Sequence, residues 1–416
     1  MIQPLENQQF KLGRDGNLYG KSDENSKDFD TLLVGNIVNQ KCVFFESVKF
    51  RFIGEFAFFS SSLETITIPS HVIEICDNAF FNCDNLRSVV FPEDSKLRSI
   101  GHYAFRNTKI ETITIPSNVV EIRDQAFCNS VQNIIFSNAS NLSLIGPNSF
   151  KESKIQKITF LSKFVPDTLM LFTDFFYRIC EVVVPPEDQR SKFENGFLLY
   201  KSKEEEENFD CLVFASQNHG NTTIPSNVKY IYPYSFYRCN RNYVFLDDSS
   251  LKDSKLLSIG ERAFWCSMIS SITIPSHVTE ICDSAFCGCQ QLRCVVFPDD
   301  SQLRLIEKNA FRSTAIETIK IPPHVTEICE LAFDGCNNLR NVVFSINSEL
   351  RSIGNCAFRS ALIETITIPP QVTEIGISAF QYCKNLRNVV FSINSELRSI
   401  GNDAFSNTAI ETITIP

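Results

Sequence analysis

A short motif, in which a small residue precedes phenylalanine, recurs along most of this 416-residue chain and constrains its fold more than any other feature. Successive copies are mostly 22 or 25 residues apart in alternation, so that the complete period is 47 residues. Repetition at such a period is typical of solenoids, in which each repeat packs only on its neighbours. The copies are Ala57-Phe58, Ala79-Phe80, Ala104-Phe105, Ala126-Phe127, Ser149-Phe150, Ser235-Phe236, Ala263-Phe264, Ala285-Phe286, Ala310-Phe311, Ala332-Phe333, Ala357-Phe358, Ala379-Phe380 and Ala404-Phe405.

Each of these motifs is followed by a segment that has the pattern of a short strand. Its apolar residues occupy the first, fourth and sixth positions, as in residues 110–115. Alternation along a strand buries the fourth and sixth positions and exposes the third and fifth. A second apolar pair, such as Val72 and Ile75, then turns the chain back over the coil. About fourteen such rungs, stacked at roughly 4.8 Å, form one continuous core about 70 Å long.

A coarser repeat at an offset of 180 residues divides the chain into two arrays. Asp15-Gly16 and Asn195-Gly196 are tight-turn dipeptides, and each opens a segment that reads as a hairpin. We therefore predict a β-rich solenoid of the leucine-rich repeat type, a right-handed coil of short parallel strands in two arrays, each preceded by a hairpin-like segment. The predicted domains are 1–188, which ends in a degenerate repeat around Phe172, and 189–416.

The second position of each strand carries charges that alternate along the stack. In a parallel, in-register stack every such residue has opposite charges on the neighbouring rungs, about 4.8 Å away, and each pair contributes roughly 0.2–1 kcal/mol. The alternation also gives a physical reason for a period of two rungs. The residues are Glu64, Arg87 and Glu111 in the first array, and Arg293, Glu317, Arg340, Glu364, Arg387 and Glu411 in the second.

Composition excludes two classes of partner. The formal charge of −9 argues against a nucleic-acid surface, because phosphate binding depends on clustered Lys and Arg. The N-terminal residues lack the apolar stretch of a secretory signal, and no run of about 18 apolar residues occurs, so we expect no membrane insertion. The compartment is left open by the sequence, and a cytoplasmic location is not excluded.

Cysteine and histidine recur at fixed places in the repeat, which predicts structural roles. Cysteines one period apart lie two rungs apart, about 10 Å, beyond the roughly 7 Å limit for a disulfide. We expect buried, reduced thiols, which suit a reducing compartment. The cysteines three residues after the Phe are Cys83, Cys239, Cys289, Cys336 and Cys383, and those four residues before it are Cys76, Cys282 and Cys329.

No catalytic, cofactor-binding or metal-binding residue is predicted. Cys287, Cys289 and Cys294 form a tight cluster but lack a second Cys pair or a His at ligand spacing. A catalytic His needs a nucleophile and an orienting group. His71, His277 and His324 instead share one loop position of the repeat, which we interpret as an exposed turn.

The pattern I-P-x-x-V-x-x-I-x-x-x-A-F-x-x-C-x-x-L, present from Ile274 to Leu292, resembles the BspA-like, Treponema-type leucine-rich repeats. The resemblance extends from about Phe50 to Pro416, and the alternation of long and short units is similar to versions from protist parasites such as Trichomonas. It implies a non-enzymatic protein-interaction or adhesion module, on the cell surface or secreted, whose ligand is a host or cell-surface protein.

Two functions follow from this reading. In the first, the exposed strand positions bind a protein ligand. In the second, the chain is a self-associating structural or scaffold protein, because a strand from Ile410 to Ile415 with no following cap leaves an open sheet edge. The residues predicted for the binding face are Thr65, Thr67, Ser88, Val90, Thr112, Thr114, Thr318, Lys320, Asn341, Val343, Thr365, Thr367, Asn388, Val390, Thr412 and Thr414.

Overall fold

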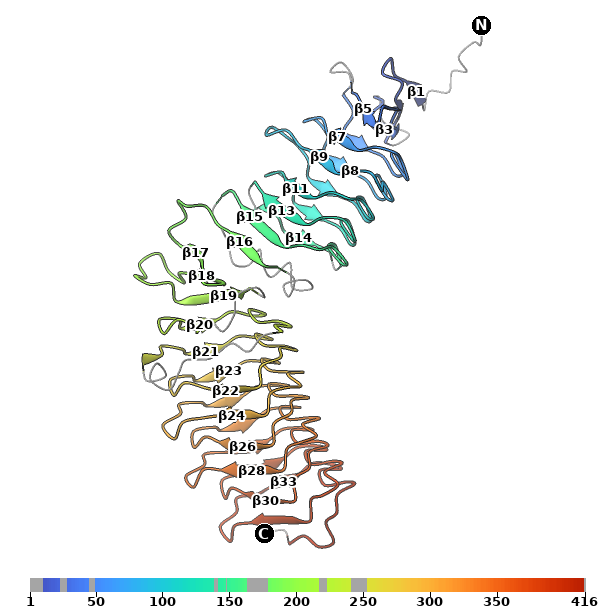
Figure 1. Cartoon of the computed structure of the whole chain (residues 1–416). Helices are drawn as coiled ribbons and strands as arrows, with labels where there is room; N and C mark the ends of the chain where they lie inside the picture. The colour runs from blue at the N-terminus through green and yellow to red at the C-terminus, as the bar shows by residue number, and fades with distance from the viewer. Residues whose placement is uncertain are drawn as a thin grey trace. The chain divides into compact units, whose positions relative to one another are not determined.

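The computed structural model is a solenoid of short, mostly parallel β-strands with almost no helix, and it describes residues 10–22, 28–44, 49–137, 141–146, 148–162, 179–216, 223–240 and 253–414 (Figure 1). The chain divides into two compact units, residues 1–189 and 190–416. Within the described ranges, no helix has the length and apolar character needed to cross a membrane.

The first unit contains one long sheet and two shorter ones. The long sheet has, in spatial order, β1 (Phe10–Leu12), β2 (Leu18–Gly20), β3 (Thr31–Val34), β6 (Phe52–Ile53), β8 (Glu74–Ile75), β10 (Ser99–Ile100), β12 (Glu121–Ile122) and β14 (Leu144–Ile145). The shorter sheets are β4 (Ile37–Val38), β5 (Lys41–Cys42), β7 (Thr65–Thr67) and β9 (Ser88–Val90), then β11 (Thr112–Ile115), β13 (Asn133–Phe136), β15 (Lys157–Phe160) and β16 (Glu181–Val183).

The second unit repeats this organisation. Its long sheet has β17 (Ser191–Glu194), β18 (Phe197–Tyr200), β19 (Cys211–Ala215), β20 (Tyr230–Ile231), β21 (Ser258–Ile259), β23 (Glu280–Ile281), β25 (Leu305–Ile306), β27 (Glu327–Ile328), β29 (Ser352–Ile353), β31 (Glu374–Ile375) and β33 (Ser399–Ile400). Its shorter sheets are β22 (Ser271–Thr273), β24 (Cys294–Val296), β26 (Thr318–Ile321) and β28 (Asn341–Phe344), then β30 (Thr365–Ile368) and β32 (Asn388–Phe391).

The hairpins predicted at the start of each array are present. β1 and β2 are antiparallel, as are β17 and β18, and a third antiparallel strand joins each long sheet to its parallel part. The same serine–aspartate contact closes both segments, since the hydroxyls of Ser22 and Ser202 donate to Asp30 and Asp210 at 2.8 and 2.6 Å. In the second unit the meander also supplies Phe197 and Leu212 to the core, so it covers the end of the first rung.

The long sheet differs from the sequence prediction. The second apolar pair of each repeat was expected only to turn the chain, whereas these segments form the two-residue strands that pair continuously through each unit, as β23 does with β25. One residue of each strand points into the core, as Ile281 and Ile306 do, and its neighbour points outward. Two residues are too few for alternation to be visible in a sequence.

The strands of the binding face form a less continuous sheet than predicted. The ladder lapses between β9 and β11 and between β28 and β30. The core stays closed there, because Ile363, Ile366 and Ile368 are no more than 1% exposed and the long sheet runs on beside them. Inward packing and the long sheet therefore hold these rungs, and the face ladder is not needed at every step.

Two further expectations concern poorly patterned segments. The C-terminal strand expected over residues 410–415 is not formed in its described part, since residues 411–414 join no sheet. Ala409 still donates its N–H to the carbonyl of Leu386 at 3.0 Å, but no ladder continues from there. The strand that motivated self-association is therefore absent from the described residues, and β32 is the last strand of its sheet. The degenerate repeat around Phe172 lies outside the described residues.

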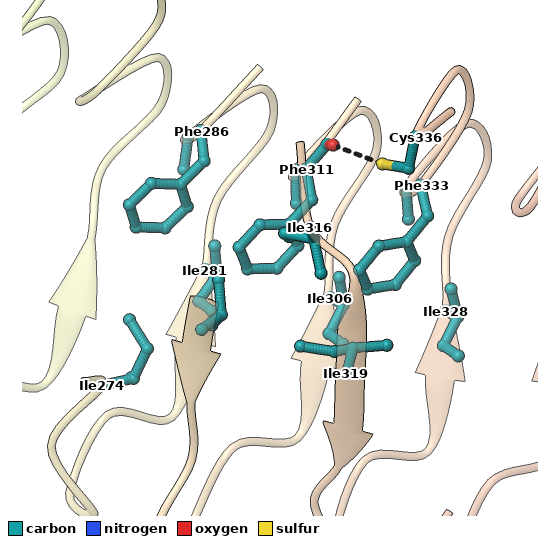
Figure 2. Close-up of a cluster of buried hydrophobic side chains, with 14 of the residues drawn as sticks. Ile274, Ile281, Phe286, Ile306, Phe311, Ile316, Ile319, Ile328, Phe333 and Cys336 are labelled. Atoms are coloured by element: carbon teal, nitrogen blue, oxygen red, sulfur yellow. Dashed lines mark hydrogen bonds between the residues drawn. The ribbon is translucent and has the colours of Figure 1, made fainter. Parts of the chain in front are cut away.

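The repeat phenylalanines form one stacked column in each unit. From Phe264 to Phe405 the ring centroids of successive rungs are 5.0–5.4 Å apart and the ring planes are within 10° of parallel. Figure 2 shows Phe286, Phe311 and Phe333 in this column above the core isoleucines. The small residue before each Phe, alanine in most repeats, leaves room for the next turn, so the pair occupies a buried corner of the coil.

Each of these corners contains two residues with left-handed backbone geometry. In every described turn the residues two before and two after the Phe have positive φ, for example Leu331 at 60° and Tyr382 at 61°. Such geometry costs an L-residue roughly 1–2 kcal/mol. The N–H groups of both kinds of residue donate to carbonyls of the following rung, with Leu331 bonded to Asn355 at 2.9 Å and Tyr382 to Ser406 at 3.0 Å. These bonds offset the strain.

Replacing one ring of the column should destabilise the second unit strongly. Phe333→Ala removes a fully buried side chain that has ring neighbours on both sides, and a loss of about 3–5 kcal/mol is expected for such a substitution. Urea unfolding followed by circular dichroism measures the loss. The control is Phe56→Ala, whose side chain is 52% exposed, and equal losses for the two variants would contradict the buried column.

Relieving the strain at a corner should stabilise the same unit. Tyr382→Asn places a residue that tolerates positive φ at an exposed position, and the unfolding free energy should rise by about 1 kcal/mol. Gly335→Ala, at φ 69°, should change it by a similar amount in the opposite direction. A lower denaturation midpoint for Tyr382→Asn would show that the tyrosine side chain outweighs its backbone strain.

Candidate interaction surface

The strand face is the solvent-exposed side of the shorter sheets, made by the third and fifth positions of each repeat strand. In β26 and β30 exposed and buried residues alternate strictly, because the fourth and sixth positions enter the core. Of the sixteen residues predicted for this face, all are exposed except Ser88 and Thr114, which are half-buried. The sequence pattern therefore identified the exposed side of the strands.

Among the described residues, the strand face has a hollow in each unit. The hollow of the second unit has a volume of about 660 Å³ and is bounded by β32, by Thr365 of β30 and by residues 412 and 414. The hollow is open between β32 and residues 411–414 because these residues do not pair with β32. The hollow of the first unit, of about 600 Å³, includes Thr65, Thr67 and His71. Both volumes are in the range of ordinary ligand pockets.

The charges predicted to pair along the border of the face stand side by side but form no ion pairs. The backbone N–H of Arg340 donates to the carbonyl of Glu317 at 2.9 Å, so the predicted register holds. Within the ranges the structure describes, no nitrogen–oxygen distance of 4.0 Å or less joins members of this row. Their side chains extend into water, where a long exposed pair gains little.

A charge ladder does form, but at a different position. Asp334 follows the repeat Phe and is 7% exposed, and it lies between Arg312 of the preceding rung, at 3.1 Å, and Arg359 of the following rung, at 2.8 Å. Sequence reasoning missed this group because it singled out charges only in the strands.

Sequence reasoning also missed two apolar side chains beside the face. Ile346 and Ile393 occupy the loops after β28 and β32, and each is fully exposed. Equivalent loops earlier in the chain carry Glu93 and Asp299, which are also exposed. An isoleucine where other repeats have a carboxylate is the signal that could have identified this position.

The repeat cysteines form a buried ladder in which each thiol donates to the previous rung. Cys289, Cys336 and Cys383 contact the carbonyl oxygens of Phe264, Phe311 and Phe358 at 2.9, 3.1 and 3.1 Å, and Figure 2 shows the second of these bonds. Burial raises the pKa of Cys336 to about 11 and that of Cys289 and Cys383 to about 12. The predicted burial is confirmed for the position three residues after the Phe, where the neutral thiol acts as a donor. The cysteines four residues before the Phe, which are Cys76, Cys282 and Cys329, are only half-buried, so the prediction was wrong for them.

The described residues bring together one group with the composition of a metal site. Ligand atoms of Glu280, Cys282 and Glu307 lie within 4.8 Å of one another. Glu280 is in β23, and Cys282 and Glu307 directly follow the neighbouring strands β23 and β25. Burial raises the pKa of Glu307, to which the nearby Glu280 adds, while an oxygen of Glu307 accepts the N–H of Asp283 at 2.7 Å. The cysteine cluster noted in the sequence is a different one, made of Cys287, Cys289 and Cys294. Cys289 is buried, Cys287 is half-buried and Cys294 is exposed, and the Cys289 thiol already donates to the carbonyl oxygen of Phe264.

The three histidines at the shared loop position do not behave alike. His277 and His324 are exposed as predicted, and His324 lies 3.0 Å from Glu349. His71 is half-buried, with its ring 5.5 Å from Phe50 and perpendicular to it. Burial lowers the pKa of His71, and Lys49 and Lys96 lower it further. The prediction of an exposed turn was wrong for His71 because Phe50 packs against its ring.

The sequence profile of the BspA-type leucine-rich repeat region matches residues 51–169, 207–340 and 304–416, which together exceed half of the chain. The chain belongs to this family. No curated protein sequence matches it significantly.

Solved structures of leucine-rich repeat proteins are similar to this member of the BspA-type family. One from Eubacterium ventriosum is 18% identical, with a TM-score of 0.57 over 97% of this chain and 96% of that protein. One from Bacteroides ovatus is 21% identical, with a TM-score of 0.45 over 96% and 90% of the two chains. A leucine-rich cell surface protein from Faecalibacterium prausnitzii is 19% identical, with a TM-score of 0.40 over 94% and 95%. At 18% identity, the likeness to the protein from Eubacterium ventriosum supports the fold alone.

The cysteine ladder gives this BspA-type chain a measurable alkaline transition. The pKa of Cys336 is higher in the folded state than its ordinary value of 9.0. The thiol therefore contributes fully to the free energy of unfolding below about pH 9, and this contribution is lost as the pH rises through about 11.

At pH about 8, native Cys289, Cys336 and Cys383 should react slowly with a thiol reagent, while the exposed Cys294 reacts rapidly. Mass spectrometry of the labelled peptides measures this, and rapid native labelling at the three ladder positions would contradict it.

Proposed function

We propose that the chain is a non-enzymatic protein-interaction module and that its strand face binds a protein partner. The observation that carries this proposal is the composition of the face. In the second unit its third and fifth positions are almost free of charge, and Lys320, which is the exception there, is paired with Asp299 at 2.6 Å. A charge-depleted centre bordered by charged residues is the arrangement expected at protein interfaces.

The side chains of this face also suit binding energetically. Thr365, Thr367 and Val390 are β-branched and therefore stiff at χ1, so that covering them costs little side-chain entropy. Thr365 and Val390 also line the hollow of the second unit, which gives a partner side chain a place to enter. Binding should consequently depend on a few rungs rather than on the whole face.

The location and origin of the protein belong to this proposal. Adhesion to a host or cell-surface protein, and a place on the cell surface, rest on the resemblance to BspA-like proteins, as does the protist type of the repeat. Detection of the protein on intact cells compared with permeabilised cells tests the location directly. Detection of the protein on intact cells supports the surface assignment, and detection only after permeabilisation opposes it.

A self-associating structural protein is the second candidate function. The observation that favours it is the full exposure of Ile346 and Ile393 at equivalent places of two successive periods, because exposed aliphatic side chains gain free energy when they are covered.

Positive charge on the strand face should abolish binding. The labelled chain is first screened on an array of purified secreted and cell-surface proteins, and the affinity for a protein that it binds is measured by surface plasmon resonance. Replacing Thr365, Thr367, Asn388 and Val390 together with Lys should weaken this affinity at least about thirtyfold, because desolvating lysines in an interface centre is costly.

The matched control carries the same four charges beside the long sheet, at Thr279, Thr326 and Thr373, which directly precede β23, β27 and β31, and at Ser399 of β33. Thr326 and Thr373 are half-buried, and the other two residues are exposed. It should bind as tightly as the unmodified chain. Both variants should have the same circular dichroism spectrum as the unmodified chain. Unchanged affinity of the strand-face variant would place the binding site elsewhere on the molecule.

A further inference from the structure

The two borders of the strand face in the second unit alternate with the same period of two rungs. On the border before the strands the row consists of Arg293, Glu317, Arg340, Glu364, Arg387 and Glu411, which are all exposed and form no ion pair within the chain at 4.0 Å or less, as far as the described residues show. In the first unit the corresponding row is alternating only over Glu64, Arg87 and Glu111 and continues with Gln132 and Gln156. In the second unit the uncharged Ser270 precedes the row, and the alternation is unbroken from Arg293 to Glu411.

The border after the strands alternates between two apolar features. Diproline turns follow β26 and β30, at Pro322-Pro323 and Pro369-Pro370, and exposed isoleucines follow β28 and β32, at Ile346 and Ile393. Each isoleucine side chain is wholly in water in the single chain, although the equivalent loop after β24 carries Asp299. Both rows thus follow the 47-residue period of the repeat.

A row of alternating charges is complementary to itself when it is reversed about a point midway between two neighbouring rungs. If two strand faces pack together around a two-fold axis parallel to the strands, the order of rungs is reversed while the strand direction is kept. With the axis midway between the rungs of Arg340 and Glu364, where the face ladder lapses, Arg340 faces Glu364 of the second copy and Glu317 faces its Arg387. Arg293 then lies toward its Glu411, which is in the last segment and joins no sheet. An axis through a rung would oppose like charges throughout.

The same axis also matches the apolar border. It places Ile346 over the Pro369-Pro370 turn of the second copy and Ile393 over its Pro322-Pro323 turn, so each exposed isoleucine meets an apolar turn. These contacts follow from the rung pairing that the charged row selects. Both borders are therefore compatible with one arrangement.

Resting on the strand face proposed above, we propose that its partner is a second copy of this chain, packed face to face as a two-fold dimer through the second unit. Six rungs at about 4.8 Å extend over only about 24 Å, which is small for a stable dimer, so association should occur in the micromolar range. Opposed exposed charges make it sensitive to salt.

Sedimentation equilibrium of the full chain tests the dimer. At low ionic strength a monomer–dimer equilibrium is expected, with a dissociation constant that rises as salt is added. A single species of monomer mass throughout the micromolar range at low salt would overturn the proposal. That result would leave the protein-interaction function standing, because the array measurement detects any other partner of the same face.

Charge reversal makes the test specific. Arg340→Glu and Glu364→Arg each convert two attractive contacts of the dimer into repulsive ones, and each should weaken it at least about tenfold. An equimolar mixture of the two variants restores opposite charges at both contacts and should form a heterodimer. If the mixture sediments like the separate variants, or if each variant alone dimerises like the unmodified chain, the arrangement is wrong.

Two controls separate these effects from misfolding. Arg351→Glu makes the same charge change at an exposed residue next to β29 on the long sheet, and it should leave the dimer intact. Thermal unfolding by circular dichroism shows whether each variant is folded, and the heterodimer itself requires both chains to be folded. Replacing Ile346 and Ile393 together with Asp should produce a monomer, and a persistent dimer would remove the apolar border from the interface.

Discussion

The fixed spacing between parallel rungs is the constraint on which this molecule depends. Backbone hydrogen bonds between neighbouring strands hold them about 4.8 Å apart. Phenyl rings that stack in parallel need nearly the same distance, and the centroids in the second column are 4.5–5.4 Å apart. One side chain can therefore be repeated on every rung without strain. The abundance of phenylalanine follows from this match between the two spacings.

The same spacing explains how small polar groups act in the core. Each ladder thiol meets a carbonyl oxygen of the rung before it, and the residues with positive φ donate to the rung after it. A buried carbonyl without a donor costs free energy, so the thiol has a structural task as a hydrogen-bond donor and not only as a filler of space. The cysteines are therefore part of the backbone hydrogen-bonding scheme of the turn.

Features with a pattern of three or more residues were predictable from the sequence. They are the buried Phe, the exposed strand positions such as Thr365 and Thr367, and the hairpin that opens each unit. The long sheet was not predictable, because its strands are two residues long. Positive φ at Leu331 and Tyr382 was also hidden, since neither residue type favours it. The exposure of Ile346 was missed because an apolar residue in a sequence is read as core.

The alternation of the borders has a consequence for how such a chain changes in length. Insertion or loss of one rung would put two arginines or two glutamates next to each other and shift every later isoleucine out of step with the diproline turns. Gain or loss of two rungs preserves both rows and displaces only the centre about which they are symmetric. Recombination within a gene of this kind is therefore tolerated in units of 47 residues, and the face can lengthen without losing its fit to an identical face.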